Sequence, residues 1–287
     1  MWSRGGAILQ QVRKHGGNLK EASELYQIPE EKLLDFSANI NPLGPPPEVY
    51  EIIISNIKKI SQYPDSRNIE LKNNLAKHLD LSLNNLVMGN GASELIFLII
   101  NHLRPQNVWI PVPTFSEYEI AAASIGANVL HLPLEGKNLA TFKLDKLKDL
   151  KKGDLLFICN PNNPTGQLYS TNLLTEVYRL TREKGAYLVI DESFLDFIEK
   201  SDQISYRKKV NDNPNLIILY SLTKFFAIPG LRLGAAISHP ELTSQFEKIR
   251  DPWNINVFAQ LAGIAALNNC EYIKNTLRFF REEKYFL

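Results

Sequence analysis

Short apolar segments recur through the central part of the chain, and longer stretches with helical character separate them. The segments are residues 108–111, 128–132, 155–159, 187–190, 216–220 and 234–237. Strands that are apolar along their whole length are typical of parallel sheets whose two faces are both covered by helices. We therefore predict an α/β fold with a mostly parallel sheet sandwiched by helices. In such sheets a ligand binds beyond the carboxyl ends of the strands.

The remainder of the chain is predicted to form helices and connecting segments. Helices are expected over residues 19–26, 48–60, 68–79 and 93–102, and the second begins after a run of three prolines, residues 45–47, which cannot continue a helix. Residues 258–287 are expected to form a long helix with a polar break at Asn268-Asn269. We divide the sequence into an N-terminal arm (1–45), a large domain (46–255) and a final helical segment (256–287).

The composition argues against several classes of protein. With 32 Lys and Arg against 31 Asp and Glu, the formal net charge of +1 gives no global attraction to nucleic acid or membranes. No stretch approaches the roughly 20 apolar residues of a membrane span, so a cytoplasmic protein is expected. Cys159 and Cys270 are too few for a disulfide framework and fit a reducing compartment. The histidines are scattered without paired ligand spacing, so no metal site is predicted.

Lys224 is the residue with the clearest chemical meaning. It follows Ser221 and Thr223 closely, and Arg232 comes eight residues later. A lysine forms a Schiff base with an aldehyde once it loses its proton, and burial and nearby cations favour that loss. Hydroxyls and a guanidinium are suitable phosphate ligands. The segment therefore predicts a site for pyridoxal 5'-phosphate (PLP), which carries an aldehyde and a phosphate. An exposed loop lysine is the alternative interpretation of this segment alone.

Two polar motifs at the ends of predicted strands would complete such a site. Asp191 follows the apolar run 187–190, and a carboxylate beside the pyridine nitrogen of PLP would favour the protonated ring. Asn163 lies in an Asn/Pro/Gly-rich motif, residues 160–166, and its amide could donate a hydrogen bond to the ring oxygen. Taken alone, the acid also fits a helix cap, and the Asn/Pro motif fits an ordinary turn.

A glycine-rich segment, residues 89–93, precedes these motifs and leads into the apolar stretch 95–100. Glycines that open a helix leave backbone N–H groups and the positive end of the helix dipole free, and that combination binds phosphate. A turn without a ligand is the alternative interpretation. The segment comes before Asn163, Asp191 and Lys224, in an order that alternating strands and helices can bring together.

In this order, the phosphate loop, the Asn-Pro-Thr-Gly motif, the aspartate and the lysine resemble the fold-type I PLP enzymes, the aspartate aminotransferase superfamily. Three more segments resemble the threonine-phosphate decarboxylases of cobalamin biosynthesis, to which the histidinol-phosphate aminotransferases are the nearest related class. These segments are residues 15–18 (HGGN), 35–44 (DFSANINPLG) and 62–65 (QYPD). The resemblance covers residues from about 13 to the end of the chain.

The resemblance implies a role for each matched residue. Lys224 would bind PLP covalently and then move the proton as acid and base, and Asp191 would pair with the ring nitrogen. Phe115 would stack on the ring. Tyr63 would reach the phosphate of the neighbouring subunit, which implies a homodimer with shared sites. The remaining residues implied in cofactor binding are Gly91, Ala92, Ser93, Asn163, Ser221, Thr223 and Arg232.

The resemblance also places residues on the substrate side of the site. These are His15, Ser37 and Asn39, and His15 would bond the phosphate of the substrate. A solvated histidine is the alternative interpretation of His15. For the cofactor contacts, a core phenylalanine and a surface tyrosine are the alternatives at Phe115 and Tyr63.

The sequence departs from the related aminotransferases at two places. Phe194 stands where they have a tyrosine that bonds the ring oxygen, and phenylalanine cannot donate that bond, which favours a decarboxylase. The family also continues into a small α/β domain whose arginine clamps the substrate carboxylate. We expect that domain to be missing here and the chain as given to be a poor catalyst. Its final helix would then expose Phe279, Phe280 and the aromatic residues near its end.

Three functions follow from these observations. The first is PLP-dependent decarboxylation of L-threonine O-3-phosphate to aminopropanol phosphate and carbon dioxide. The second is a PLP-dependent aminotransferase of the histidinol-phosphate type, and the third is an inactive PLP-binding fragment. The reaction depends on which bond at the substrate Cα stands perpendicular to the ring. It is the bond to the carboxylate for decarboxylation and the bond to hydrogen for transamination.

Overall fold

The computed structural model describes residues 16–286 of the chain. The chain divides into two compact units between Ile40 and Asn41. The first unit contains helix α1 (Leu19–Tyr26) and the 3-10 turn η1 (Glu30–Lys32). Helix α1 has the predicted bounds because Asn18 caps it, with its side-chain oxygen accepting a hydrogen bond from the backbone N–H of Glu21 at 3.2 Å.

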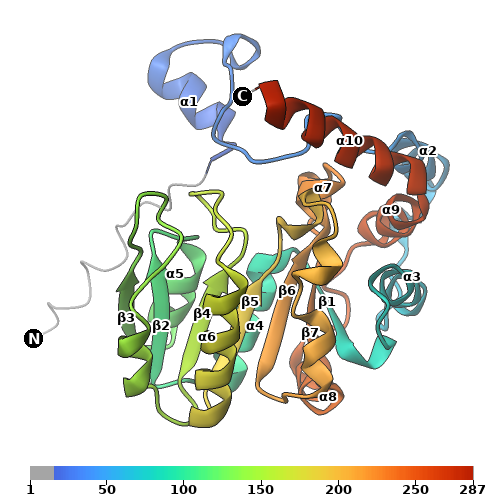
Figure 1. The fold of residues 1–287 in the computed structure, drawn as a ribbon. Helices are drawn as coiled ribbons and strands as arrows, with labels where there is room; N and C mark the ends of the chain where they lie inside the picture. The colour runs from blue at the N-terminus through green and yellow to red at the C-terminus, as the bar shows by residue number, and fades with distance from the viewer. Residues whose placement is uncertain (1–15, 287) are drawn as a thin grey trace, which may run out of the picture. The chain divides into compact units, whose positions relative to one another are not determined.

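The second unit is built on a seven-stranded sheet with the order β1-β7-β6-β5-β4-β2-β3 (Figure 1). Strands β2 to β6 run parallel to one another, whereas β7 runs antiparallel to both β1 and β6. This arrangement confirms the predicted α/β fold with a mostly parallel sheet. The strands are β1 (Leu86–Gly89), β2 (Asn107–Val112), β3 (Asn128–Pro133), β4 (Leu155–Cys159), β5 (Tyr187–Asp191), β6 (Leu216–Ser221) and β7 (Gly234–Ser238).

Two hydrophobic clusters pack against the two faces of this sheet. In β6, Leu216, Ile218 and Tyr220 belong to one cluster, and the alternate residues Ile217 and Leu219 belong to the other. The first cluster packs against α3 (Ile69–Leu79), α6 (Thr171–Lys184) and α9 (Val257–Asn268). The second packs against α4 (Ala92–Leu103), α5 (Glu117–Ser124) and α8 (Pro240–Ile249). In Figure 1, α6 lies in front of the sheet and α4 and α5 lie behind it.

The remaining elements are short or lie beside the sheet. They are α2 (Pro47–Ser55), α7 (Leu222–Phe225), α10 (Cys270–Phe286) and the 3-10 turns η2 (Ile57–Ser61), η3 (Leu83–Asn85), η4 (Leu144–Asp149), η5 (Leu195–Phe197), η6 (Ser201–Gln203), η7 (Arg207–Asn211) and η8 (Pro229–Leu231). No helix in residues 16–286 is long and apolar enough to cross a bilayer.

Three elements differ from the sequence prediction or refine it. The helix expected over 48–60 ends at Ser55 and continues as a 3-10 turn, because the side chain of Asn56 bonds the carbonyl oxygen of Ile52 at 2.9 Å. Strand β1 was not predicted, since its four residues give too short a pattern. The polar break in the last helical segment is confirmed: α9 ends at Asn268 and α10 begins at Cys270.

The end of α10 is less exposed than the sequence suggested. Tyr285 and Phe286 are largely exposed, as expected. Phe279 and Phe280 are instead half-buried, and the ring of Phe280 packs against Phe197 with a centroid distance of 4.7 Å. On α10, the largely exposed aromatic residues are therefore Tyr285 and Phe286 at its end.

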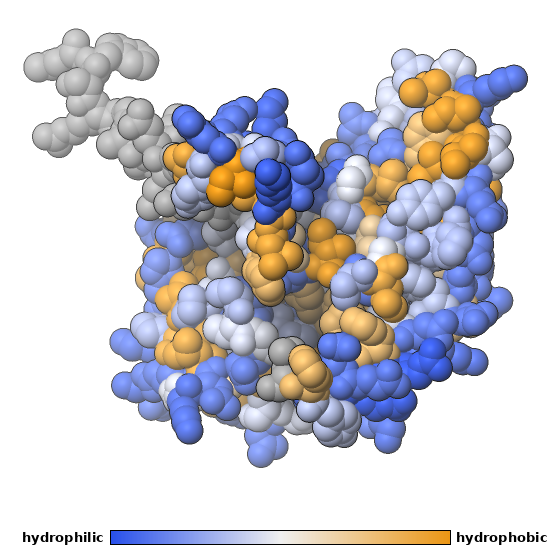
Figure 2. Space-filling view, turned by 90° about the horizontal axis from the view of Figure 1, so that it is seen from above, coloured by the Kyte–Doolittle hydropathy of each residue, from blue (hydrophilic) through white to orange (hydrophobic). Residues whose placement is uncertain are grey.

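The parallel strands end at the upper edge of the sheet in Figure 1, where α7 follows β6. Neighbouring strands end level with one another, because Cys159 of β4 pairs with Asp191 of β5. Figure 2 views the molecule from this end and shows hydrophobic residues exposed among hydrophilic ones. The motif residues at the ends of β4, β5 and β6 therefore share one edge of the sheet.

Gly234 allows β7 to pass close to the start of α4. A Cβ atom there would lie 2.9 Å from the backbone nitrogen of Ala92 and 3.0 Å from the carbonyl oxygen of Tyr220. We expect Gly234→Ala to lower the free energy of unfolding by about 1–3 kcal/mol in denaturant titrations. Gly230→Ala is the matched control, because a Cβ atom there meets nothing within 4 Å. Equal stability of the two variants would contradict the close approach.

Candidate functional site

Asp191 lies at the end of β5 and is only 4% exposed. Its Oδ1 accepts a hydrogen bond from the backbone N–H of Ser193 at 2.9 Å, and its Oδ2 accepts one from the hydroxyl of Tyr118 at 2.7 Å. Burial raises the pKa of the Asp191 carboxyl, whereas these hydrogen bonds and the positive charge of Lys224 oppose that rise. The site thus holds a buried acid that specific donors keep closer to its ionised form.

Lys224 lies in α7, the short helix that follows β6 directly. Burial lowers the pKa of its ammonium group, the nearby Arg232 guanidinium lowers it further, and Asp191 opposes both effects. A lowered pKa makes the free amine available nearer neutral pH, which a lysine needs to attack an aldehyde. The structure thus brings Lys224, Asp191 and Arg232 within electrostatic reach of one another, as the sequence prediction requires.

The backbone around Lys224 is anchored by a buried polar network. The backbone N–H of Asn41 donates to the carbonyl oxygen of Lys224 at 3.1 Å, and the Asn41 side-chain amide donates to the carbonyl oxygen of Phe225 at 2.9 Å. The same amide reaches the hydroxyls of Tyr272 and Thr276 on α10 at 2.9 and 3.0 Å. Asn41, at the start of the second unit, therefore fixes the lysine helix against the last helix.

The predicted phosphate loop and Arg232 are in direct contact. Gly91 precedes α4 with a φ of +80°, and the helix receives no side-chain cap at its N-terminus. A Cβ atom on Gly91 would lie 2.3 Å from Nη2 of Arg232, so a larger residue would displace the guanidinium, and the φ of Gly91 also favours glycine. Ala92 and Ser93 form the first turn of α4 and are half-buried. Backbone N–H groups at a helix start beside an arginine form a cradle for an anion.

Ser221 and Thr223 directly precede Lys224 in the chain. Both are buried, and their hydroxyl oxygens are 2.8 Å apart. Ser221 also caps α7 and pairs with Gly234, the residue that lies against the backbone of Gly91 and Ala92. The structure therefore places these hydroxyls beside the start of α4, where the sequence predicted phosphate contacts.

Two loops carry the residues predicted to contact the cofactor ring. Phe115 is half-buried and meets Tyr118 edge to face, with a centroid distance of 5.6 Å. The loop of Phe115 is tied to the Asn/Pro motif by Asn162, whose Oδ1 accepts a hydrogen bond from the hydroxyl of Thr114 at 2.8 Å. Asn163 is half-buried, and its backbone lies beside the Cys159 thiol at the end of β4. The loop of Phe115 and the backbone of Asn163 thus lie near the strand ends that carry Cys159 and Asp191.

Tyr63 is a different case. Its side chain is 81% exposed, and its ring packs against that of Trp253 in a tilted arrangement with a centroid distance of 4.8 Å. None of the contacts described for residues 16–286 joins Tyr63 to Asp191, Lys224 or Arg232. A role in the same subunit's site therefore gains no support, and a role toward a second subunit stays a prediction.

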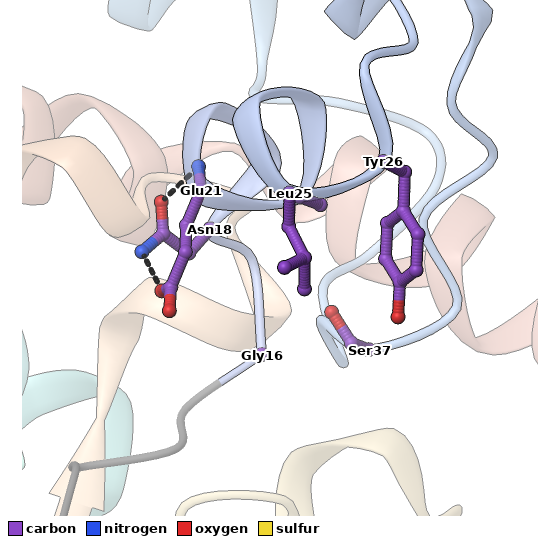
Figure 3. Close-up of a pocket in the computed structure, with 7 residues that line it drawn as sticks. Gly16, Asn18, Glu21, Leu25, Tyr26 and Ser37 are labelled. Carbon is purple, nitrogen blue, oxygen red and sulfur yellow. Dashed lines mark hydrogen bonds between the residues drawn. The ribbon is translucent and has the colours of Figure 1, made fainter.

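The residues predicted on the substrate side belong to the first unit. His15 lies outside the described residues. Ser37 is exposed; its Oγ accepts a hydrogen bond from the backbone N–H of Gly17 at 2.8 Å and donates one to Asp35 at 2.5 Å. Asn39 is also exposed. Ser37 borders a cavity of about 350 Å³ toward which Leu25 and Tyr26 point from α1 (Figure 3). Their role toward a substrate remains a prediction.

Sequence reasoning missed two residues of this site. Tyr118 follows Phe115 by three residues, and this spacing, which places two residues on one side of a helix, was the available signal. Asn41 carried no comparable signal, because the hydrogen-bond partners of its side-chain amide are 184 to 235 residues away in the sequence. In the described part of the chain, no group of three or more His, Cys, Asp or Glu side chains could hold a metal ion.

The arrangement fits PLP by the chemistry of its donor groups. A helix start with an arginine against Gly91 suits a phosphate, a lysine with lowered pKa suits an aldehyde, and a buried carboxylate suits a ring nitrogen that carries a proton. These three features lie along neighbouring strand ends of one sheet. Gly91, Arg232, Lys224 and Asp191 thus form a chemically consistent set, from which Tyr63 of the same chain is absent.

Comparisons with known proteins agree with this interpretation. The sequence profile of the aminotransferase class I and II family matches residues 31–284. The threonine-phosphate decarboxylase of Salmonella typhimurium is 38% identical over 274 residues, which are 94% of this chain and 74% of that protein. A histidinol-phosphate aminotransferase of Desulfitobacterium hafniense is 35% identical, covering 86% of this chain and 69% of that protein. The crystal structure of the histidinol-phosphate aminotransferase from Clostridium acetobutylicum has a TM-score of 0.78 and 34% identity, covering 88% of this chain and 75% of that one.

The charge of Arg232 can be tested through the reactivity of Lys224. Arg232→Gln removes a cation that disfavours the ammonium form, so the pKa of Lys224 should rise and its labelling by acetic anhydride should need a higher pH. A coulombic repulsion of about 1 kcal/mol between two like charges a few ångströms apart would make labelling at neutral pH fall roughly five-fold. Arg104→Gln, at the far end of α4, is the control. If the pH midpoint of Lys224 labelling is unchanged or lower in Arg232→Gln, Arg232 does not lower the pKa of Lys224.

Proposed function

Because the chain belongs to the class I and II aminotransferase family, we propose that it is a PLP-dependent lyase. The reaction is decarboxylation of L-threonine O-3-phosphate to (R)-1-amino-2-propanol phosphate, a step of cobalamin biosynthesis. The observation that carries the proposal is the meeting of Lys224, Asp191 and the Gly91–Arg232 cradle at one edge of the sheet. The 38% identity to a protein named threonine-phosphate decarboxylase supports the substrate.

Each residue of the site has a defined task in this proposal. Gly91, Ala92, Ser93, Ser221, Thr223 and Arg232 would hold the cofactor phosphate. Asp191 would face the ring nitrogen and Phe115 the ring, while Asn163 would donate to the ring oxygen. When bound, PLP supplies an electron sink for whichever bond at the substrate Cα stands perpendicular to its ring. Lys224 would bind the aldehyde and afterwards return a proton to Cα, which its lowered pKa suits.

Phe194 favours decarboxylation over transamination. It immediately precedes η5, is half-buried, and its ring stacks on Phe197 with a centroid distance of 6.4 Å. The related aminotransferases are expected to have a hydroxyl at this position, and Phe194 offers none. Asn163 is then left as the donor to the ring oxygen. On the substrate side, His15, Ser37 and Asn39 would bind the phosphate of threonine phosphate.

The second candidate function is transamination of histidinol phosphate. It is supported by the Desulfitobacterium relative at 35% identity and by the Clostridium structure, both named as histidinol-phosphate aminotransferases. Both candidate substrates carry a phosphate and an amine, so the residues proposed to bind the cofactor serve either reaction. The products distinguish the two reactions. Decarboxylation releases carbon dioxide, whereas transamination converts the amine of the substrate to a ketone and passes the amino group to a keto acid.

The reaction can be decided with the purified protein and added PLP. We expect carbon dioxide from threonine phosphate and no keto product from histidinol phosphate with 2-oxoglutarate. Lys224→Ala should abolish turnover and the absorbance band of lysine-bound PLP, because no other residue then links to the aldehyde. Lys208→Ala, an exposed lysine paired with Asp80, is the control and should behave as the wild type. A borohydride-reduced PLP adduct that persists on another lysine of Lys224→Ala would argue against the site.

We also propose that the enzyme is a cytoplasmic homodimer. Exposed apolar residues recur along α2 and η2 at a spacing of three or four residues and continue to Tyr63, which packs against the half-exposed Trp253. They are Tyr50, Ile54, Ile57, Ile60 and Tyr63, and we refer to them as the α2 stripe. A stripe of this kind on a water-exposed surface favours association. A second copy bound here would bring Tyr63 toward the neighbouring site, as the resemblance implies.

The dimer proposal predicts the effect of a charge on the α2 stripe. Ile54 and Ile60 are 72% and 74% exposed, so Ile54→Glu/Ile60→Glu should fold normally but dissociate to monomers in analytical ultracentrifugation. Burying an unpaired carboxylate in an interface costs several kcal/mol, which exceeds what one stripe can recover. Leu139→Glu, in the turn after β3, is the control for an exposed apolar residue outside the stripe. A dimer that survives both charges would refute this interface.

A further inference from the structure

Tyr118 is buried in the site without belonging to any motif of the sequence analysis. It lies in the first turn of α5, its side chain is 0% exposed, and its hydroxyl is 2.7 Å from Oδ2 of Asp191. Its ring stacks on Phe157 with a centroid distance of 4.5 Å and an interplanar angle of 9°. The ring of Phe115 meets it in a T-shaped arrangement with a centroid distance of 5.6 Å. The hydroxyl is therefore fixed in place by the packing of its own ring.

We propose that Tyr118 is a positioning residue that holds Asp191 in its ionised form and aims it at the ring nitrogen of PLP. This inference rests on the PLP site proposed above. Tyr118 would not touch the reacting atoms. It would act through Asp191, and its ring would act in addition on Phe115, the residue proposed to stack on the cofactor.

The direction of the hydrogen bond follows from the surroundings. A tyrosine hydroxyl can donate or accept, whereas an ionised carboxylate can only accept. Burial and the negative charge of Asp191 hold the pKa of Tyr118 well above its ordinary value, so the phenol keeps its proton. The backbone N–H of Ser193 already donates to the other oxygen of Asp191. Two fixed donors on two oxygens favour the carboxylate and disfavour its protonated form.

The groups that face Asp191 come from three elements. Tyr118 approaches from α5, Cys159 from the end of β4 and Lys224 from α7. Burial and the charge of Asp191 raise the pKa of the Cys159 thiol to about 12, so it stays neutral near pH 7. Lys224 is thus the cation among these groups, and it would lose its charge on binding the aldehyde. The hydroxyls of Ser193 and Tyr118 would then be the side-chain donors that support the Asp191 charge, and Tyr118 is the one that comes from another element.

Tyr118→Phe tests the proposal, because phenylalanine keeps the ring stacked on Phe157 and removes only the donor. Tyr169→Phe is the matched control: Tyr169 is also buried, and its hydroxyl has no hydrogen-bond partner among the described residues. The first measurement is the ionisation of Asp191 in the protein without PLP, from carboxyl infrared bands assigned with Asp191→Asn. The second is the Kd for PLP across pH, from equilibrium dialysis.

Loss of the donor should raise the pKa of Asp191, so on acidification the carboxylate is lost already at a higher pH. The Kd for PLP in Tyr118→Phe should then exceed that of the wild type about ten-fold on the acidic side and approach it on the alkaline side. Tyr169→Phe should match the wild type in both measurements. A loss of packing alone would change the Kd equally at every pH and leave the Asp191 titration unmoved.

A second variant covers the case in which Tyr118→Phe does not fold. Incorporation of 3-fluorotyrosine at position 118 keeps the packing and makes the hydroxyl a stronger donor, so the pKa of Asp191 should fall. An Asp191 titration that is the same in wild type, phenylalanine and fluorotyrosine proteins overturns the inference. If the wild type itself fails to bind PLP, the proposed function is wrong, while the infrared titration still decides whether Tyr118 controls Asp191.

Discussion

A carboxylate at the buried end of a strand is the constraint on which the rest of the site depends. Asp191 is 4% exposed, and taking a charge out of water is costly unless fixed groups replace the lost hydration. Tyr118, the backbone of Ser193 and the charge of Lys224 provide that replacement from separate elements. Each of these groups must be placed to within hydrogen-bond or electrostatic reach, which requires the sheet, α5 and α7 to pack together in one arrangement.

The parallel sheet explains how these groups from distant parts of the sequence come together. Parallel strands deliver their carboxyl ends to one edge, so residues far apart in sequence meet without long excursions. The reversal of β7 has a separate effect. Because β7 runs antiparallel between β1 and β6, its first residue, Gly234, lies against both the start of α4 and the end of β6. The phosphate cradle and the lysine helix are therefore neighbours through one glycine.

Much of this could be predicted from the sequence, since the responsible signals are local. Apolar runs located β2 to β7, and polar residues directly after them located Asp191, Asn163 and Lys224. Strand β1 and the end of α2 escaped prediction because a four-residue strand and one asparagine side chain give weak patterns. The direction of β7 and the partners of Tyr118 and Asn41 depend on tertiary packing. No periodicity in the sequence records which distant group will lie beside them.

The network around Asn41 has a consequence for the order in which the site is completed. Its amide joins the turn after Lys224 to Tyr272 and Thr276, which are synthesised after every strand of the sheet. When β7 has just left the ribosome, the nascent chain already contains Asp191, Lys224 and Arg232. The hydrogen bonds that join Asn41 and the lysine helix to Tyr272 and Thr276 cannot yet form. The lysine helix therefore takes its finished setting only when α10 leaves the ribosome, which makes it one of the last parts of the fold to become rigid during translation.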